Sequence, residues 1–364
     1  MAYYLNGKLH YYGYYNGQKI TIAVPRPALE QLTAPTISLD GDTLTMTATD
    51  DRTQEFVIFV DGVETATVAN EQPEEYPTPT EGLAYELSSN GTYYTCTGIG
   101  TATDTDIVIA NEIEGIPVRA IKAVAFVDNT TIRSVVIPRN VLTIYGEAFL
   151  RCKKLISVTM SYGLLRIYNY AFRGCSALKS VNIPDSVVHI GEDILGSTAY
   201  YNNSDNWINN ILYNGNWLFS AKSNISGVVS IRDNTIGVAG SAFKSCESMS
   251  SVIMPNTTKT IDYAAFSFCK KLSSIQFSNT LSIIGDGTSS SVFVSCTSLT
   301  AVKLPKSVTK IGYLTFNGCT SLSVIEFEGT VEEWNAVQKH SEWCWKSSKG
   351  SAKYVTCTNG TVAI

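Results

Sequence analysis

The sequence has few histidines, no long apolar stretch and no excess of basic residues. Three of its 364 residues are histidine, and 27 basic residues stand against 32 acidic ones, which gives a net charge of −5. A chain without a basic excess lacks the electrostatic footprint that grips a phosphate backbone. No stretch reaches the roughly eighteen apolar residues that a membrane-spanning helix requires. Neither nucleic-acid binding nor a membrane span is expected.

A signal peptide is also lacking in the chain as it stands. The N-terminal run MAYYLNGKLHYYGYYNGQ has neither a charged n-region nor an apolar h-region. This absence does not argue for a cytoplasmic protein, because a virion protein needs no leader.

Motifs of enzymes and metal sites are absent as well. The sequence contains no G-x-S-x-G, H-E-x-x-H or P-loop pattern and no C-x-x-C pair, and His10, His189 and His340 lie far apart in the chain. A nucleophile needs an oriented base, and zinc needs closely spaced ligands. The acidic pair Glu332-Glu333 is interpreted as a solvated helix turn. The sequence therefore predicts no enzyme, with no catalytic residue, metal or cofactor.

What the sequence does contain is a repeat. The pattern Ile-x-x-x-Ala-Phe-x-x-Cys-x-x-Leu-x-x-Val-x-Ile-Pro recurs, mostly at intervals of 23 residues, and its phenylalanine column runs through Phe126, Phe149, Phe172, Leu195, Phe243, Phe266, Phe293 and Phe316. One unit cannot bury its apolar side alone, whereas stacked copies share a continuous core. We expect a mainly β solenoid of about eight turns, with short helical or 3-10 segments on its convex side.

Six of the nine cysteines belong to the repeat, because each stands three residues after a phenylalanine: Cys152, Cys175, Cys246, Cys269, Cys296 and Cys319. The favoured interpretation is a small buried hydrophobe that faces its copies in adjacent turns. Cys344 and Cys357 lie outside this column. Whether they form a disulfide stays open.

These repeats resemble the BspA-type leucine-rich repeats of bacterial surface proteins. The resemblance is carried by VVHIG at 187–191, AFRGC at 171–175 and LKSVNIP at 178–184, and it covers about 107–327. The segments 329–334 and 355–360 resemble the end of that family. The resemblance implies a leucine-rich-repeat solenoid whose function is adhesion, through binding to host matrix or other cells.

The chain divides into six regions on this interpretation. They are a β-hairpin segment at 1–33, a run similar to part of a fibronectin- or immunoglobulin-like module at 34–70, a proline-rich acidic linker at 71–82, an N-terminal cap at 83–120, the solenoid at 121–328 with an insertion at 198–226, and a C-terminal cap at 329–364. The dipeptides Asn6-Gly7 and Asn16-Gly17 favour tight hairpin turns. The segment before the solenoid is therefore expected to be all-β.

Two surfaces are candidates for recognition. The first is the outward row of the repeat strands, which varies from turn to turn and includes Thr159, Asn182, Gln276, Lys303 and Glu326. The second is the insertion, whose aromatic residues include Tyr200, Tyr201, Trp207 and Trp217. Aromatic side chains give large contact areas at small entropic cost. The competing interpretations are a plain solvated sheet for the row and internal packing for the rings.

The predicted function is adhesion or receptor binding to a protein or glycan partner on a cell surface. The alternative is a carbohydrate-binding accessory module whose aromatic insertion stacks on sugar rings. The expected location is extracellular, on a bacterial surface or on a phage virion as a tail-associated protein. In the virion, residues 1–33 would dock the chain to a larger assembly.

Overall fold

The structure is a computed structural model that describes residues 77–285, 290–344 and 352–364, and before them the backbone of seven strands. The chain forms two units, Met1–Tyr76 and Pro77–Ile364. Each unit is described by itself.

The first unit contains an antiparallel sheet in the order β1-β2-β3-β6-β7 and a separate β4-β5 pair. The strands are β1 (Ala2–Leu5), β2 (Lys8–Tyr15), β3 (Gln18–Pro25), β4 (Thr36–Asp40), β5 (Thr43–Thr47), β6 (Glu55–Val60) and β7 (Val63–Ala69). The predicted turns Asn6-Gly7 and Asn16-Gly17 lie outside the described residues, as do residues 71–76 of the predicted linker. The fibronectin- or immunoglobulin-like module stays a prediction.

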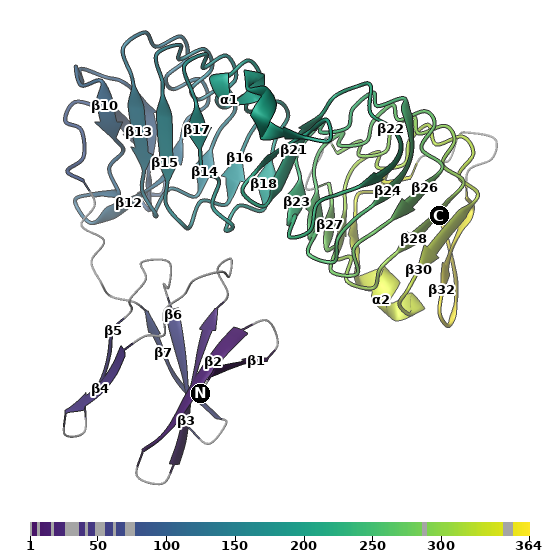
Figure 1. Cartoon of the computed structure of the whole chain (residues 1–364), viewed down its shortest axis with the longest axis horizontal. Coiled ribbons are helices and arrows are strands. Elements are labelled where there is room, and N and C mark those ends of the chain that lie inside the picture. Colours follow the sequence, from purple (N-terminus) through teal and green to yellow (C-terminus); the bar gives the residue numbers. More distant parts are fainter. Residues whose placement is uncertain are drawn as a thin grey trace. The chain divides into compact units, whose positions relative to one another are not determined.

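The second unit is a β-solenoid in which each turn contributes one strand to each of two parallel ladders (Figure 1). We name the strands that carry the predicted outward row the row strands and those on the other ladder the opposite strands. In the first stack of turns the row strands are β10 (Asp106–Val108), β13 (Ser134–Ile137), β15 (Ser157–Met160) and β17 (Ser180–Val181). The opposite strands are β12 (Ile116–Ile121), β14 (Thr143–Ile144), β16 (Arg166–Ile167) and β18 (His189–Ile190), preceded by β9 (Tyr94–Gly98) and β8 (Ala84–Leu87), with β11 (Glu112–Ile113) beside β12.

A second stack follows, and Figure 1 shows that the two stacks meet near α1 (Ala199–Asn202) and β21 (Trp217–Ala221). Its opposite strands are β21 (Trp217–Ala221), β23 (Gly237–Val238), β25 (Thr260–Ile261), β27 (Ile283–Ile284), β29 (Lys310–Ile311) and β31 (Gln338–Lys339). Its row strands are β22 (Ser226–Ser230), β24 (Ser248–Ile253), β26 (Ser274–Gln276), β28 (Ala301–Leu304), β30 (Val324–Phe327) and β32 (Tyr354–Cys357), with β33 (Gly360–Ala363) beside β32. The mainly β solenoid is confirmed, with about ten turns instead of eight.

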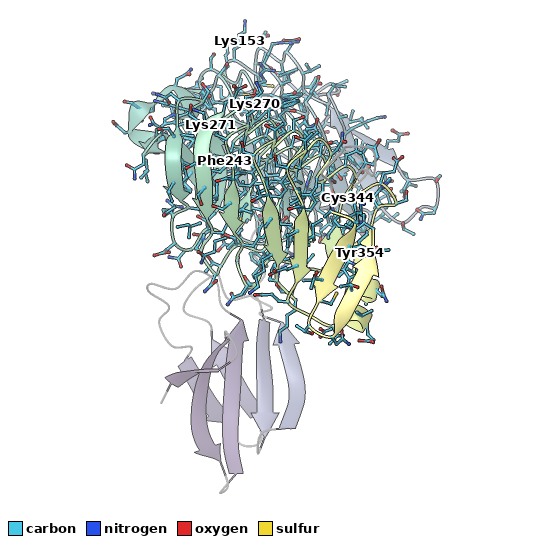
Figure 2. All side chains as sticks on the ribbon, turned by 90° about the vertical axis from the view of Figure 1, so that its right-hand side faces the viewer. Lys153, Phe243, Lys270, Lys271, Cys344 and Tyr354 are labelled. Atoms are coloured by element: carbon cyan, nitrogen blue, oxygen red, sulfur yellow. The ribbon has the colours of Figure 1, made fainter. Side chains whose placement is uncertain are left out.

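The phenylalanine column is the core of both stacks. Phe126 and Phe149 stack with ring centroids 4.9 Å apart and planes 6° apart, and Phe243 and Phe266 do so at 5.0 Å and 8°. All four side chains are buried, and Figure 2 shows Phe243 inside the stack, with Lys270 at its outer edge. The column is not continuous, because the buried apolar residues form two clusters that divide between Leu195 and Phe243.

The segment around each repeat phenylalanine is a turn and not a helical or 3-10 segment. Around Phe149 the residues two before and two after, Glu147 and Arg151, have φ of 58° and 57°. Left-handed residues at this spacing are incompatible with a right-handed helix. The N–H groups of residues 147, 149 and 151 instead donate to carbonyls of the next turn over 2.8–2.9 Å. We call these segments phenylalanine turns.

The repeat cysteines help to join consecutive turns. The Cys152 thiol donates to the carbonyl of Phe126 at 3.0 Å, and the Cys175 thiol donates to that of Phe149 at the same distance. All nine cysteines are buried free thiols, which include Cys344 and Cys357. The favoured interpretation of cysteine as a small core residue is therefore confirmed, with a hydrogen bond as an additional reason for its position.

A short helix and two tryptophans close the last turn. α2 (Val331–Ala336) begins with a capping box between Thr330 and Glu333, which places the pair Glu332-Glu333 in its first turn as expected. Trp334 and Trp343 are buried with ring centroids 5.5 Å apart, whereas Trp345 lies outside the described residues. No helix in the described part of the chain is long and apolar enough to span a membrane.

Candidate functional site

The predicted row residues Thr159, Asn182, Gln276, Lys303 and Glu326 are all exposed. They alternate with buried core residues: in β15 the exposed Thr159 stands between Val158 and Met160, which are 4% and 8% exposed. Side chains on a strand point to opposite faces in turn, so the burial of the repeated positions fixes the outward direction of the variable ones. The outward orientation predicted from the repeat is correct.

The row is divided among three hydrogen-bonded sheets. Thr159 pairs with Val136 in the first stack, and Asn182 follows β17 in that sheet, whereas Ile253 pairs with Gln276 in a second sheet. Lys303 and Glu326 are partners in a third sheet. The predicted binding residues therefore lie on three sheets. We call the exposed residues of each sheet a patch, and the second and third patches are neighbours, because β26 contacts β28.

The third patch combines charge with exposed apolar surface. Lys303 Nζ lies 2.8 Å from Glu328 Oε1, and this hydrogen bond raises the pKa of the Lys303 ammonium. Next to this pair, Val324 is 41% exposed and Tyr354 is 57% exposed. Charged and apolar side chains are mixed here on the three adjacent strands β28, β30 and β32.

The aromatic residues of the insertion mostly pack inward. Trp217 is fully buried, so its prediction as a ligand-binding residue is wrong: an indole with no exposed face cannot meet a partner. Its ring lies against Gly237, where a Cβ atom would come within 2.4 Å of it. Trp207 is half-buried and donates from Nε1 to the Tyr201 carbonyl at 2.7 Å, and the Tyr200 hydroxyl donates to the Tyr213 carbonyl at 2.7 Å.

The insertion forms the junction between the two stacks. It contains α1 (Ala199–Asn202), a 3-10 turn, η1 (Ser204–Asn206), β19 (Trp207–Ile208) and the hairpin of β20 (Ile211–Asn214) and β21. The hairpin predicted from Asn214-Gly215 is confirmed. Asn214 is buried and its side chain caps the free edge of β17, where its amide donates to Val181 O at 2.7 Å and its Oδ1 accepts from Ile183 N at 3.3 Å.

A buried polar pair also joins the stacks. His189 Nδ1 in β18 lies 2.7 Å from Asp262 Oδ1, which follows β25 in the second stack. The second oxygen of this carboxylate accepts from the backbone N–H of Ile190 at 2.9 Å. Because Asp262 is fully buried, both contacts are shielded from water, and they join β18 at the end of the first stack to the segment after β25 in the second stack.

A cleft of about 380 Å³ opens at this junction. It lies between the phenylalanine turn at 191–197 and the one at 240–245, and Tyr201, Leu212 and Phe219 form its apolar side. We call it the junction cleft. Tyr201 is the predicted site residue that the structure places here.

The charges around the junction cleft are paired. Lys244 Nζ reaches across to Glu192 Oε1 at 3.2 Å, and Arg173 Nε lies 3.0 Å from Asp193 Oδ2. Burial raises the pKa of the Asp193 carboxyl, and Arg173 acts in the opposite direction. The rim therefore carries two ion pairs with no net excess of either sign.

The junction cleft has a signal in the sequence that the repeat pattern alone did not reveal. Leu218 and Val229 occupy the ladder positions that Val238 and Val252 hold in the next turn. The chain connects Leu218 to Val229 with fewer residues than it uses to connect Val238 to Val252. This turn is too short to form a complete phenylalanine turn, and the space beside it is the cleft.

The buried thiols offer no activated nucleophile. Burial raises the pKa of Cys96 and of Cys246 to about 12 each, and that of Cys344 to about 11, so these thiols are protonated at neutral pH. Among the described residues no group of three or more His, Cys, Asp or Glu side chains is placed to hold a metal ion.

Comparisons with known proteins give a family and a set of similar folds. A model of the BspA type leucine rich repeat region matches residues 107–226 and 215–338, with six copies. A leucine rich repeat protein of T. pallidum shares 23% identity with this chain, covering 61% of this chain and 90% of that one, at a TM-score of 0.36. A leucine rich cell surface protein from Faecalibacterium prausnitzii shares 22%, covering 72% and 97%, at 0.33, and the pneumococcal vaccine antigen PcpA shares 14%, covering 99% and 88%, at 0.38. A search of curated proteins found no match.

Proposed function

Because the chain belongs to the BspA-type leucine-rich-repeat family, we propose that it is a non-enzymatic adhesion or receptor-binding protein that recognises a protein partner through its row strands. Proteins with these repeats are usually protein-interaction or surface proteins. The proposed location is accordingly the bacterial surface or a phage virion. On a virion, residues 1–33 would attach the chain to the larger assembly.

The observation that carries this proposal is the contrast within each row strand. In β28 and β30, Val302, Leu304, Ile325 and Phe327 are buried, while Lys303 and Glu326 between them are exposed. The repeated side chains are committed to the core, and the varied ones face solvent on a rigid scaffold. A rigid surface with varied side chains suits recognition, because little conformational entropy is lost on binding.

A protein partner is favoured over a glycan by the state of the aromatic rings in the insertion. Sugar rings stack on exposed aromatic faces, but Trp217 is buried, and Trp207 is half-buried with its N–H bonded and Lys222 Nζ 5.1 Å from its ring. The third patch instead presents the exposed Tyr354 and Val324 beside charged groups. Such a mixture of apolar and charged side chains is typical of protein interfaces.

The proposal is tested by measuring binding of the fluorescently labelled chain to intact cells by flow cytometry. We expect binding to fall when the cells are treated with protease and to persist after glycosidase treatment. Two single variants, Lys303→Glu and Glu326→Lys, should each weaken binding about tenfold or more, as expected for residues at the centre of an interface. Lys271→Glu is the matched control, because Lys271 is exposed but lies in the turn before β26 and not in a row strand.

Binding that is lost with glycosidase and kept after protease would support the carbohydrate-binding alternative instead. Equal binding by the row variants and by Lys271→Glu would show that the row strands are not the contact surface. For the virion location, purified particles probed with an antibody against residues 1–33 give a direct readout.

A further inference from the structure

The phenylalanine turns are joined by backbone hydrogen bonds that all run in one direction. In the turn at 170–174, the N–H groups of Tyr170, Phe172 and Gly174 donate to the carbonyls of the next turn at 2.8–3.1 Å. The turn at 241–245 does the same with Ser241, Phe243 and Ser245, at 2.7–2.8 Å. Each complete turn thus presents three N–H donors to its successor and three carbonyl acceptors to its predecessor.

The turn at 191–197 differs, because within the described residues the N–H groups of Asp193, Leu195 and Ser197 have no hydrogen-bond acceptor. Its own carbonyls are used by the preceding turn, since Glu192, Ile194 and Gly196 accept from residues 170, 172 and 174. Asp193 and Ser197 have φ of 50° and 60°, so the turn has the same shape as its paired counterparts.

The junction cleft is where the missing acceptors would lie. Residues 191–196 form one wall of it, and 240–245 form much of the other. On that second wall the Ala242 carbonyl accepts from Ala221 N at 2.7 Å, whereas the carbonyls of Gly240 and Lys244 accept no hydrogen bond from the described residues. One wall therefore offers donors and the other offers acceptors.

The chain's own short turn fills only part of this space. Ala221 N donates from this short turn to the second wall, and Gly240 N of that wall donates to Ile190 O at 2.8 Å. Leu212 and Phe219 provide an apolar side. Leu195, which replaces phenylalanine in the column, is 1% exposed and lines the cleft. An apolar side chain entering from outside would meet the half-buried ring of Tyr201, which lines the cleft.

We propose that the junction cleft binds a peptide segment of a partner protein, whose backbone carbonyls accept from the N–H groups of Asp193 and Leu195 in the cleft wall, and of Ser197 directly after it, and so complete the missing phenylalanine turn. A peptide fits better than a free anion, because the rim charges are already paired: Lys244 with Glu192, and Arg173 with Asp193. Backbone addition to unpaired backbone groups is a general mode of peptide recognition. The volume of about 380 Å³ lies within the range of ligand sites.

This site is separate from the row strands and goes beyond the proposed function, so each can fail without the other. Its test uses no natural partner. The probe is a synthetic peptide that copies Tyr145–Cys152, with serine in place of the cysteine, because in the intact solenoid the carbonyls of this segment accept from the turn at 124–128. A scrambled peptide of the same composition is the control.

The measurement is the amide signal and the hydrogen-exchange rate of each backbone N–H in the isotopically labelled full chain. Without peptide, Asp193, Leu195 and Ser197 should exchange faster than the paired Tyr170, Phe172 and Gly174. With the peptide their signals should shift saturably and their exchange should slow about tenfold or more, while the scrambled peptide has no such effect.

Two variants sharpen the result. Ser220→Trp places a large ring at the half-buried side of the cleft and should abolish the peptide response, whereas Ser226→Trp, an exposed position of the same insertion outside the cleft, should keep it. The wild-type comparison of the two peptides remains decisive if Ser220→Trp does not fold.

Three results would overturn the proposal. They are slow exchange at Asp193, Leu195 and Ser197 before any peptide is added, equal shifts with the scrambled peptide, and peptide-induced shifts confined to the row strands. Protection that appears without peptide as the protein concentration rises would assign the cleft to a second copy of this chain instead.

Discussion

The two stacks of the solenoid are built alike but end differently. In both, phenylalanine rings lie in parallel, as for Phe149 and Phe172 at 5.3 Å and for Phe293 and Phe316 at 5.4 Å. The second stack ends under α2 and the buried rings of Trp334 and Trp343. The first ends at Leu195, against a hairpin that covers its core but leaves one phenylalanine turn without a successor.

This difference separates two requirements that every solenoid end must meet. An end must cover its apolar core, and it must satisfy the backbone groups that would have met the next turn. The C-terminal end buries its last core residues under dedicated rings. The junction buries Trp217 and Leu212 just as well, yet it satisfies the edge of β17 with a single side chain, Asn214.

Removing one ring from either stack should have the largest effect on stability. Phe172→Ala and Phe266→Ala each remove a fully buried ring that stacks on its neighbours, so we expect a loss of roughly 3–5 kcal/mol in the free energy of unfolding. Chemical denaturation followed by circular dichroism measures it. An unchanged unfolding midpoint in either variant would contradict the stacked core.

The position of the ring within its stack refines this prediction. Phe172 stacks on Phe149 in the first cluster, but the next residue in the column is Leu195, whereas Phe266 has Phe243 and Phe293 on its two sides. Phe266→Ala should therefore be the more destabilising of the two. The reverse order would show that the junction is packed more tightly than the interior of a stack.

The capping of β17 by Asn214 should give the next largest effect. Asn214→Ala leaves Val181 O and Ile183 N without their side-chain partners inside the protein, which costs about 1–3 kcal/mol. Asn216→Ala is the matched control, since Asn216 bonds the exposed Asp185 carboxylate at 3.0 Å and its loss should cost about 0.5 kcal/mol or less. Comparable losses in the two variants would mean that the Asn214 contacts do not stabilise the junction.

Much of this architecture could be predicted from the sequence, because inward positions repeat and outward ones do not. The spacing of Phe126, Phe149 and Phe172 defines the core, and alternation around Thr159 gives its outward direction. Asn214-Gly215 correctly indicated a hairpin. These features depend on local pattern and period, which a single sequence displays directly.

What could not be predicted depends on contacts between distant residues. Trp217 looks like any surface aromatic in the sequence, and only its position between the two stacks buries it. The shape of the phenylalanine turns was not predicted, since left-handed φ at residues such as Glu147 has no glycine to reveal it. The pairing of His189 with Asp262 joins positions 73 residues apart, a separation without any sequence signal.

Alkaline pH should weaken the core through its buried thiols. In the unfolded chain a cysteine ionises near its ordinary pKa of 9.0, whereas burial raises the pKa of Cys246 to about 12. Because the pKa of this thiol is higher in the folded protein than in the unfolded chain, its contribution to stability is fully present below pH 9. That contribution is lost as the pH rises from 9 toward 12. One thiol contributes a slope of at most about 1.4 kcal/mol per pH unit.

The measurement is a series of denaturation curves between pH 8 and about pH 11 on the wild-type chain and on Cys246→Ala. The variant is less stable at pH 8, because it loses buried volume, but its stability should fall less steeply above pH 9. Parallel slopes for the two proteins would show that Cys246 is not protonated in the folded state at these pH values.

The ion pairs on the surface should give the smallest effect, and they test whether the junction behaves like the interior of a stack. Lys270 Nζ lies 2.8 Å from Glu247 Oε1 between consecutive turns, and Lys244 Nζ lies 3.2 Å from Glu192 Oε1 across the junction cleft. Lys270→Met should change the free energy of unfolding by about 0.5 kcal/mol or less, because both partners are more than half exposed. Lys244→Met should cost slightly more, since the Glu192 side chain is 18% exposed and keeps its charge in a less hydrated place.

Raising the salt concentration should reduce the contribution of the Lys270 pair further than that of the Lys244 pair, as screening acts most strongly on exposed charges. Equal salt dependence in denaturation curves of the two variants would mean that the cleft rim is as open to solvent as the outer edge of the stack.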